Sequence, residues 1–101
     1  MAIIDWRTVP VPVPIGTGRR TIPGVATFAP QVQVVRAAVA LNGFKLEYVN
    51  QHRVLVVEAD TDLNNIAGNV VNFSIECDLR DNSGNDDYSG YVTVLVIAEV
   101  Q

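Results

Sequence analysis

The chain of 101 residues has only one cysteine, one histidine and one tryptophan, and each scarcity excludes a class of protein. A single cysteine cannot form an intrachain disulfide, so a disulfide framework is excluded. One cysteine and one histidine also make a zinc site improbable on numbers alone, and we expect neither a metal nor a cofactor. Cys77 alternates with polar neighbours, so we expect it to be buried as a core thiol.

Charge is also scarce, at 18% of the residues, with a formal net charge of −4 and a pI near 4.6. An acidic chain does not bind nucleic acid through bulk charge. No apolar run reaches the roughly 20 residues of a membrane-spanning helix. The first residues have neither the basic start nor the apolar core of a signal peptide. We therefore expect no membrane partner and synthesis in a cytoplasm.

Apolar residues, in contrast, are abundant: they make up 49% of the chain, and the mean hydropathy is +0.22. A single domain of this length has a small interior relative to its surface. It cannot hide so much apolar surface by itself, so we expect part of that surface to be covered between subunits.

Two stretches show the period of two that is typical of β-strands. Residues 70–79 alternate apolar and polar side chains, which predicts one buried and one solvated face. Residues 91–100 also alternate, but their second face contains Leu95 and Ile97. A strand that is apolar on both faces is expected to be covered on both.

The other predicted strands are shorter. Residues 21–28 read as a strand that Pro23 places at a sheet edge, and residues 31–41 read as the next strand, with a helix over 32–41 as the alternative. Asn42-Gly43 is a strong hairpin signal before a strand at 44–48. A strand at 53–59 follows, and residues 60–69 and 81–90 are predicted as polar loops.

The first 20 residues differ from the rest, because residues 9–15 alternate β-branched residues with proline. Proline lacks an N–H and fixes φ, so this segment is neither a helix nor a central strand. We expect an extended arm, polyproline-like or at a sheet edge, which packs along its own domain or reaches a neighbouring subunit. The predicted oligomer contacts in the arm are Ile3, Ile4, Trp6, Val9, Val11, Val13 and Ile15, joined by Leu95 and Ile97.

Together these patterns predict an all-β protein: an extended arm over residues 1–20 and an antiparallel β-sandwich of about six strands, such as a jelly roll, over residues 21–101. No catalytic constellation is present, and His52 has no nucleophile in a recognisable context. The acidic loop at 81–87 lacks the spacing of a calcium-binding EF-hand loop. Tyr88, in the polar loop predicted at 81–90, is expected to be exposed.

One family resemblance follows from the order of these segments. Thr27-Phe28, Pro30, Arg53-Val54, Asn72-Phe73 and Val96-Ile97-Ala98 resemble the pattern of the H-type lectins. That resemblance implies a six-stranded sandwich that forms trimers or trimer pairs and binds galactosamine-type sugars. The sugar contacts it implies are Arg53, Arg80, Asp81 and Asn82, with Tyr88 as a stacking candidate, although the family's aromatic and histidine are absent at 80–81 and its closing tryptophan is Val96.

A second resemblance is one of type. A short, acidic, all-β chain with an apolar, proline-rich beginning is similar to small bacteriophage structural proteins, such as capsid decoration (cement) proteins and tail sandwiches. It implies a non-enzymatic homo-oligomer, with three copies as the favoured number, bound to a major capsid or tail protein in a virion. The alternative is an H-type-lectin-like carbohydrate-binding oligomer.

Overall fold

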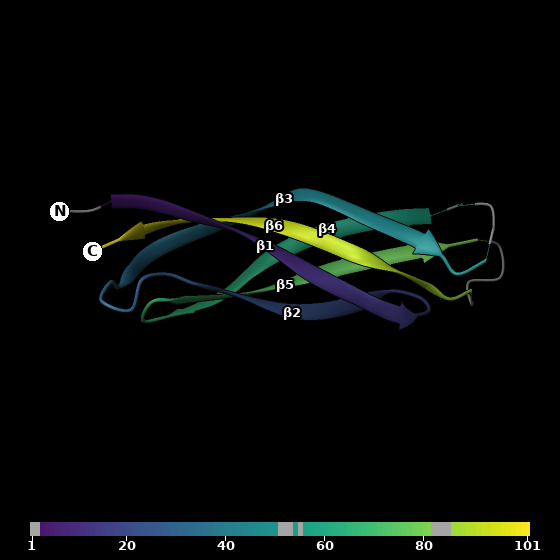
Figure 1. The fold of residues 1–101 in the computed structure, drawn as a ribbon, viewed down its shortest axis with the longest axis horizontal. Coiled ribbons are helices and arrows are strands. Elements are labelled where there is room, and N and C mark those ends of the chain that lie inside the picture. The colour runs from purple at the N-terminus through teal and green to yellow at the C-terminus, as the bar shows by residue number, and fades with distance from the viewer. Residues whose placement is uncertain (1–2, 51–53, 55, 82–85) are drawn as a thin grey trace.

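A computed structural model describes residues 3–50, 54, 56–81 and 86–101 as an all-β protein (Figure 1). It contains six strands, and every pairing between them is antiparallel. No helix occurs in these ranges, so the predicted all-β fold is confirmed. The strands are β1 (Ile3–Gly16), β2 (Arg20–Thr27), β3 (Val34–Tyr48), β4 (Val56–Ala67), β5 (Val70–Arg80) and β6 (Tyr88–Val100).

The strands form two three-stranded sheets, in the orders β1-β6-β3 and β2-β5-β4. The molecule is long and narrow, with principal extents of 53 × 17 × 15 Å. The strands run along the long axis and twist together, and both chain ends lie at the same end of the molecule (Figure 1). At that end the backbones of Gln33 and Gln101 exchange two hydrogen bonds of 2.9 Å each.

The inner rows of the two central strands form the core. Along β5 the predicted alternation is confirmed, because the apolar row is buried while Asn72, Ser74 and Glu76 are only half-buried; Asp78 is the exception in the polar row and is buried. Cys77 is 1% exposed, which confirms the predicted core thiol. The buried inner rows are Val71, Phe73, Ile75, Cys77 and Leu79 on β5 and Val92, Val94, Val96, Ala98 and Val100 on β6.

The proline-rich beginning of the chain is a sheet-edge strand of the domain itself. β1 pairs with β6 from Ile3 to Gly16, so of the two predicted placements the structure shows packing along its own domain. An arm separate from the sandwich is not confirmed. Val11 and Val13 face the core and are buried, whereas the prolines that flank them are exposed.

The predicted hairpin at Asn42-Gly43 is wrong. Both residues lie inside β3, which continues to Tyr48 along the same partner, β6. The register shifts between Leu41 and Gly43, so the extra residue forms a β-bulge instead of a turn. β6 offers a continuous partner on both sides of this point, and extension of the ladder therefore replaces a local reversal.

The predicted polar loop at 60–69 is also wrong for most of its length, because β4 continues to Ala67. Its polar residues lie on the solvent side of the sheet, where a strand tolerates them, while Thr61 and Ile66 face inward. The reversal occurs at Gly68-Asn69, between the paired Ala67 and Val70. Gly68 has φ +60°, as the first central position of a type II′ turn requires. Of the strand predicted at 53–59, residues 53 and 55 lie outside the described residues.

Candidate interaction surface

The outer row of β6 is the most unusual feature of the surface. Strand β6 is central in its sheet, so its outward side chains are flanked on both sides by β1 and β3. Leu95 is half-buried by these neighbours, and Ile97 and Tyr91 remain 40% and 45% exposed. The second apolar face predicted for this strand is therefore present and uncovered in the single chain.

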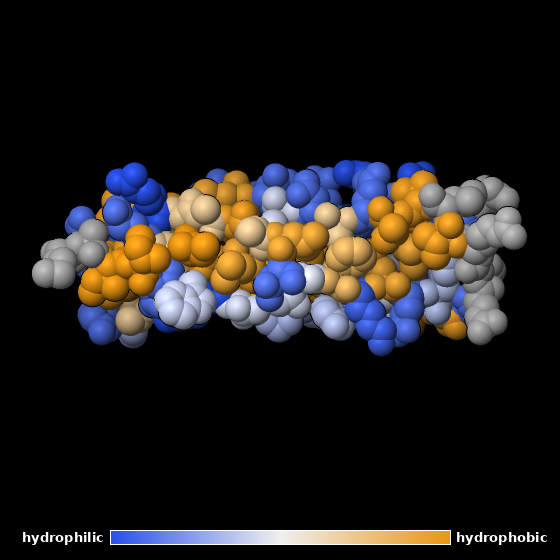
Figure 2. Space-filling model, turned by 90° about the horizontal axis from the view of Figure 1, so that it is seen from above, coloured by the Kyte–Doolittle hydropathy of each residue, from blue (hydrophilic) through white to orange (hydrophobic). Residues whose placement is uncertain are grey.

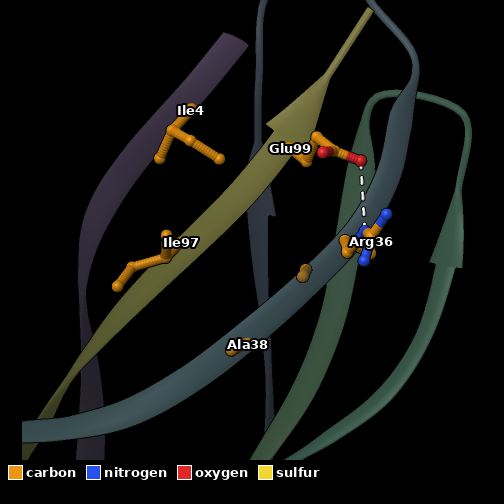
Figure 3. Close-up of a pocket in the computed structure, with 6 residues that line it drawn as sticks. Ile4, Arg36, Ala38, Ile97 and Glu99 are labelled. Carbon is orange, nitrogen blue, oxygen red and sulfur yellow. Dashed lines mark hydrogen bonds and ion pairs between the residues drawn. The ribbon is translucent and has the colours of Figure 1, made fainter. Parts of the chain in front are cut away.

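The register of the sheet groups apolar side chains around Ile97. Trp6 of β1 and Ala38 of β3 lie directly opposite Ile97 on either side. The short side chain of Ala38 leaves a hollow beside Ile97, and Ile4 borders the same hollow from β1 (Figure 3). A second hollow adjoins it and is lined by Ile4, Trp6, Leu95 and Ile97. We call Ile4, Trp6, Ala38, Leu95 and Ile97 the apolar face.

One ion pair borders the apolar face. Arg36 of β3 lies opposite Glu99 of β6, and Arg36 Nε lies 3.1 Å from Glu99 Oε2 (Figure 3). The Arg36 side chain is 78% exposed, so it is held only at its guanidinium end. The apolar face therefore has both signs of charge at one border, as the rim of a protein interface commonly does.

The predicted contact residues of the first strand fall into two groups. Ile3, Ile4, Trp6 and Ile15 are 59–67% exposed and available to a partner. Val11 and Val13 are buried in the core of their own chain, and Val9 packs against that core. Trp6, a predicted oligomer contact, is 62% exposed on the outer side of the sheet.

Apolar surface also extends along one side of the molecule. Seen from the side that is uppermost in Figure 1, an apolar band follows most of the long axis between polar borders (Figure 2). Exposed apolar side chains also occur on two edge strands, and they include Leu41 and Phe44 of β3 and Val57 and Leu63 of β4. They oppose inward-facing residues of the central strands, so they mark where the space between the two sheets opens at its edge.

Tyr88 is placed opposite to its prediction: it begins β6 and is 0% exposed. Its hydroxyl donates to the Gly18 carbonyl at 2.5 Å, and the Arg20 guanidinium lies 4.4 Å from the ring centre. Arg20 also donates to the carbonyl of Pro14. Burial raises the pKa of Tyr88, and the hydrogen bond from Arg20 opposes that rise. This residue ties the β1–β2 turn to the core and is unavailable for stacking on a sugar.

The other residues implied by the lectin resemblance do not form a described site. Arg53 and Asn82 lie outside the described residues. Arg80 is exposed, and its Nε lies 2.8 Å from Oδ2 of the buried Asp78. Asp81 is half-buried. The pKa of Tyr48 is raised, first because Tyr48 itself is partly buried and second because the negative charge of Asp81 lies nearby.

The described ranges contain neither a metal-ion cluster nor a membrane-spanning helix. No group of three histidine, cysteine, aspartate or glutamate side chains in them could hold a metal ion. No helix in them is long and apolar enough to cross a membrane. His52, and Asn82 and Asn85 of the acidic loop, lie outside the described residues.

Comparison with known proteins gives no relatives. No protein-family model, no curated protein and no solved structure matches the chain. The resemblances to H-type lectins and to phage structural proteins therefore stay predictions, and function has to be argued from the surface itself.

Proposed function

We propose that this chain is a non-enzymatic structural protein that works by self-association through the apolar face. The observation that carries the proposal is the exposure of Ile4, Trp6 and Ile97 on a sheet whose inner face already supplies a complete core. Exposed apolar patches that are bordered by charge are typical of protein–protein contact sites. Apolar area removed from water contributes about 25 cal/mol per Å², so such a patch can drive assembly without specific chemistry.

The assembly that we propose is a larger particle, such as a phage capsid or tail, with the chain attached as a ring of three copies. A heterologous contact, in which one patch meets a different patch of the next copy, closes into such rings. The exposed Ile3 and Ile15 at the two ends of β1 then remain for a capsid or tail protein. Mass spectrometry of purified particles is expected to find the chain in stoichiometric amounts; its absence from every particle would exclude this setting.

The test of self-association is an Ile97→Lys variant, measured by sedimentation velocity over a concentration series. A lysine is expected to shift the protein from multimers toward the monomer, because Ile97 lies at the centre of the apolar face. The matched control is Val25→Lys, since Val25 is 54% exposed on the outer side of the other sheet. Wild-type protein that sediments as a monomer at all concentrations would refute the proposal.

A further inference from the structure

The four edge strands of the described structure are not equally protected against pairing with another strand. On β1 the N–H of Trp6 donates to Asp5 Oδ1 at 2.8 Å, and the Trp6 carbonyl accepts from Arg7 at 2.8 Å. The backbone of Trp6 therefore points to the free edge. Pro10, Pro12 and Pro14 lie at the same alternation and have no N–H to offer there. An added strand could not bond to this edge.

The edges of the other sheet are also blocked. On β4 the backbone N–H of Thr61 points to the free edge, where it donates to Asp60 Oδ1 at 2.8 Å. The outward side chains Glu58, Asp60 and Asp62 on that strand are all acidic and would repel a second copy of themselves. β2 has only eight residues and contains Pro23. Charge, proline and short length are the usual protections of a sheet edge.

β3 differs, because its free edge contains no proline over 15 residues. Trp6 lies opposite Ile97, but its backbone N–H and C=O point away from β6, so this is a non-hydrogen-bonded pair. The N–H and C=O of Ile97 therefore point the other way, toward Ala38 of β3. The backbone N–H and C=O groups of the neighbours Ala37 and Val39 then point to the free edge of β3. Beyond the bulge, Val49 donates to Asp87 at 3.0 Å, which fixes the alternation there. The backbone N–H and C=O groups of Phe44 and Leu46 therefore also point to the free edge, while their side chains face inward.

The charges of β3 suit an antiparallel copy of the same strand. A twofold axis at Leu41-Asn42 places Arg36 of each copy opposite Glu47 of the other, and both are exposed residues on the outer face. Because the bulge shifts the alternation by one residue, this register also brings inward-facing residues together. Val39 then meets Phe44, and Ala37 meets Leu46.

We infer that β3 pairs with β3 of a second copy about this twofold axis and joins two β1-β6-β3 sheets into one. The pairing satisfies the outward backbone groups of Ala37, Val39, Phe44 and Leu46. It also covers the side chains of Leu41 and Phe44, which are 41% and 44% exposed in the single chain, at the open side of the sandwich. The pairing uses the backbone edge of β3, whereas the apolar face lies on the outer side of the sheet; the two adjoin at Ala38 and Arg36. Substitutions at Val39, which faces the core, and at Ile97, which faces outward, therefore test the two contacts separately.

The first test removes one outward N–H and keeps the ladder with β6. Val39→Pro is expected to weaken the twofold contact at least about 30-fold, since two N–H donors are lost per pair of copies. Val39→Ala is the matched control, because it removes side chain but retains the N–H. Sedimentation in an Ile97→Lys background reports the twofold step alone, and circular dichroism verifies folding. Equal association of Val39→Pro and wild type, or equal loss in Val39→Ala, would overturn the inference.

The second test addresses the register and does not depend on proline. Arg36→Glu and Glu47→Arg should each associate poorly alone, because each homodimer has two like-charged pairs. Mixed in equal amounts, the two variants should form a heterodimer, in which both pairs are of opposite charge. Native mass spectrometry separates the species by mass. Homodimers as abundant as heterodimers would exclude this register.

Discussion

β5 and β6 occupy the same position, the centre of a three-stranded sheet, and their inner rows are alike. Val71, Phe73 and Ile75 on β5 are 0% exposed, as are Val94 and Val96 on β6. These two rows face each other across the sandwich and form one core. One face of each strand is thus enough to form the buried apolar core.

The outer rows of the same two strands are unlike each other. β5 presents Ser74 and Glu76 to solvent and lies beside the acidic residues of β4, with Arg19 bridging Glu58 and Glu76. β6 presents Leu95 and Ile97. The polar outer row shows that the fold does not need apolar residues there. The fold therefore does not require the apolar outer row of β6, and this difference is the basis of the proposed self-association.

The sharpest way to break the comparison is to place a carboxylate on either side of β6. Val96→Asp is expected to unfold the protein, because an unpaired charge in the core costs about 3–5 kcal/mol of a small total stability. Ile97→Asp, one residue later on the outer face, should change the free energy of unfolding by less than about 1 kcal/mol. Urea denaturation measures both; similar losses would show that the outer row belongs to the core.

A glycine pair tests how closely β3 follows β6. A Cβ on Gly90 would lie 1.7 Å from the carbonyl oxygen of Lys45, so Gly90→Ala should cost about 3 kcal/mol or more. Gly43 lies on β3 near the bulge and has open space where a Cβ would be. Gly43→Ala should therefore leave the melting temperature almost unchanged. A well-tolerated Gly90→Ala would contradict the pairing of Gly90 with Leu46.

Tyr88→Phe removes only the hydroxyl that donates to Gly18. Loss of this buried hydrogen bond should lower the free energy of unfolding by about 1–2 kcal/mol, because the Gly18 carbonyl loses its donor. Thermal or urea unfolding at neutral pH measures the change. An unchanged stability would place the ring packing, and not the hydroxyl, in control of the β1–β2 turn.

The same variant separates the alkaline titration of the buried Tyr88 from that of the half-buried Tyr48. Burial raises the pKa of Tyr88 above its unfolded value of about 10, so the folded state keeps a proton that the unfolded state loses. Stability should therefore be constant below about pH 10 and fall as the pH rises further. Tyr88→Phe should flatten part of this decline; the remainder is expected from Tyr48, whose pKa is also raised by burial.

The smallest change in stability is expected from Arg19, which lies beside the acidic residues of β4 and β5. Arg19 is exposed and pairs with Glu58 and with Glu76, the latter at 2.7 Å. Arg19→Ala should lower the melting temperature slightly at low salt, because it leaves the carboxylates of β4 and β5 uncompensated. The difference should disappear in about 1 M salt, where charges are screened within roughly 3 Å. A loss that persists at high salt would indicate packing by the arginine stem.

Sequence patterns predicted the strands whose alternation is clean and failed where local signals compete with pairing. The row from Val71 to Leu79 was readable, because every second residue is apolar. Asn42-Gly43 favours a hairpin locally, but the bulge became visible only once β6 was known as a continuous partner. Tyr88 was wrongly predicted to be exposed, because its neighbours in sequence are polar. The residue that accepts its hydrogen bond, Gly18, is 70 residues away and cannot be inferred from them.

The sequence by itself determined the all-β fold, the buried thiol of Cys77 and the presence of more apolar surface than one inner face needs. These properties follow from the composition and from a period of two, which are local. Only the tertiary structure decided that the proline-rich beginning is an edge strand, that Trp6, Ile97 and Ala38 lie in one row, and that β3 is an edge strand without proline. Strand order and register depend on contacts between distant residues, and no local pattern specifies them.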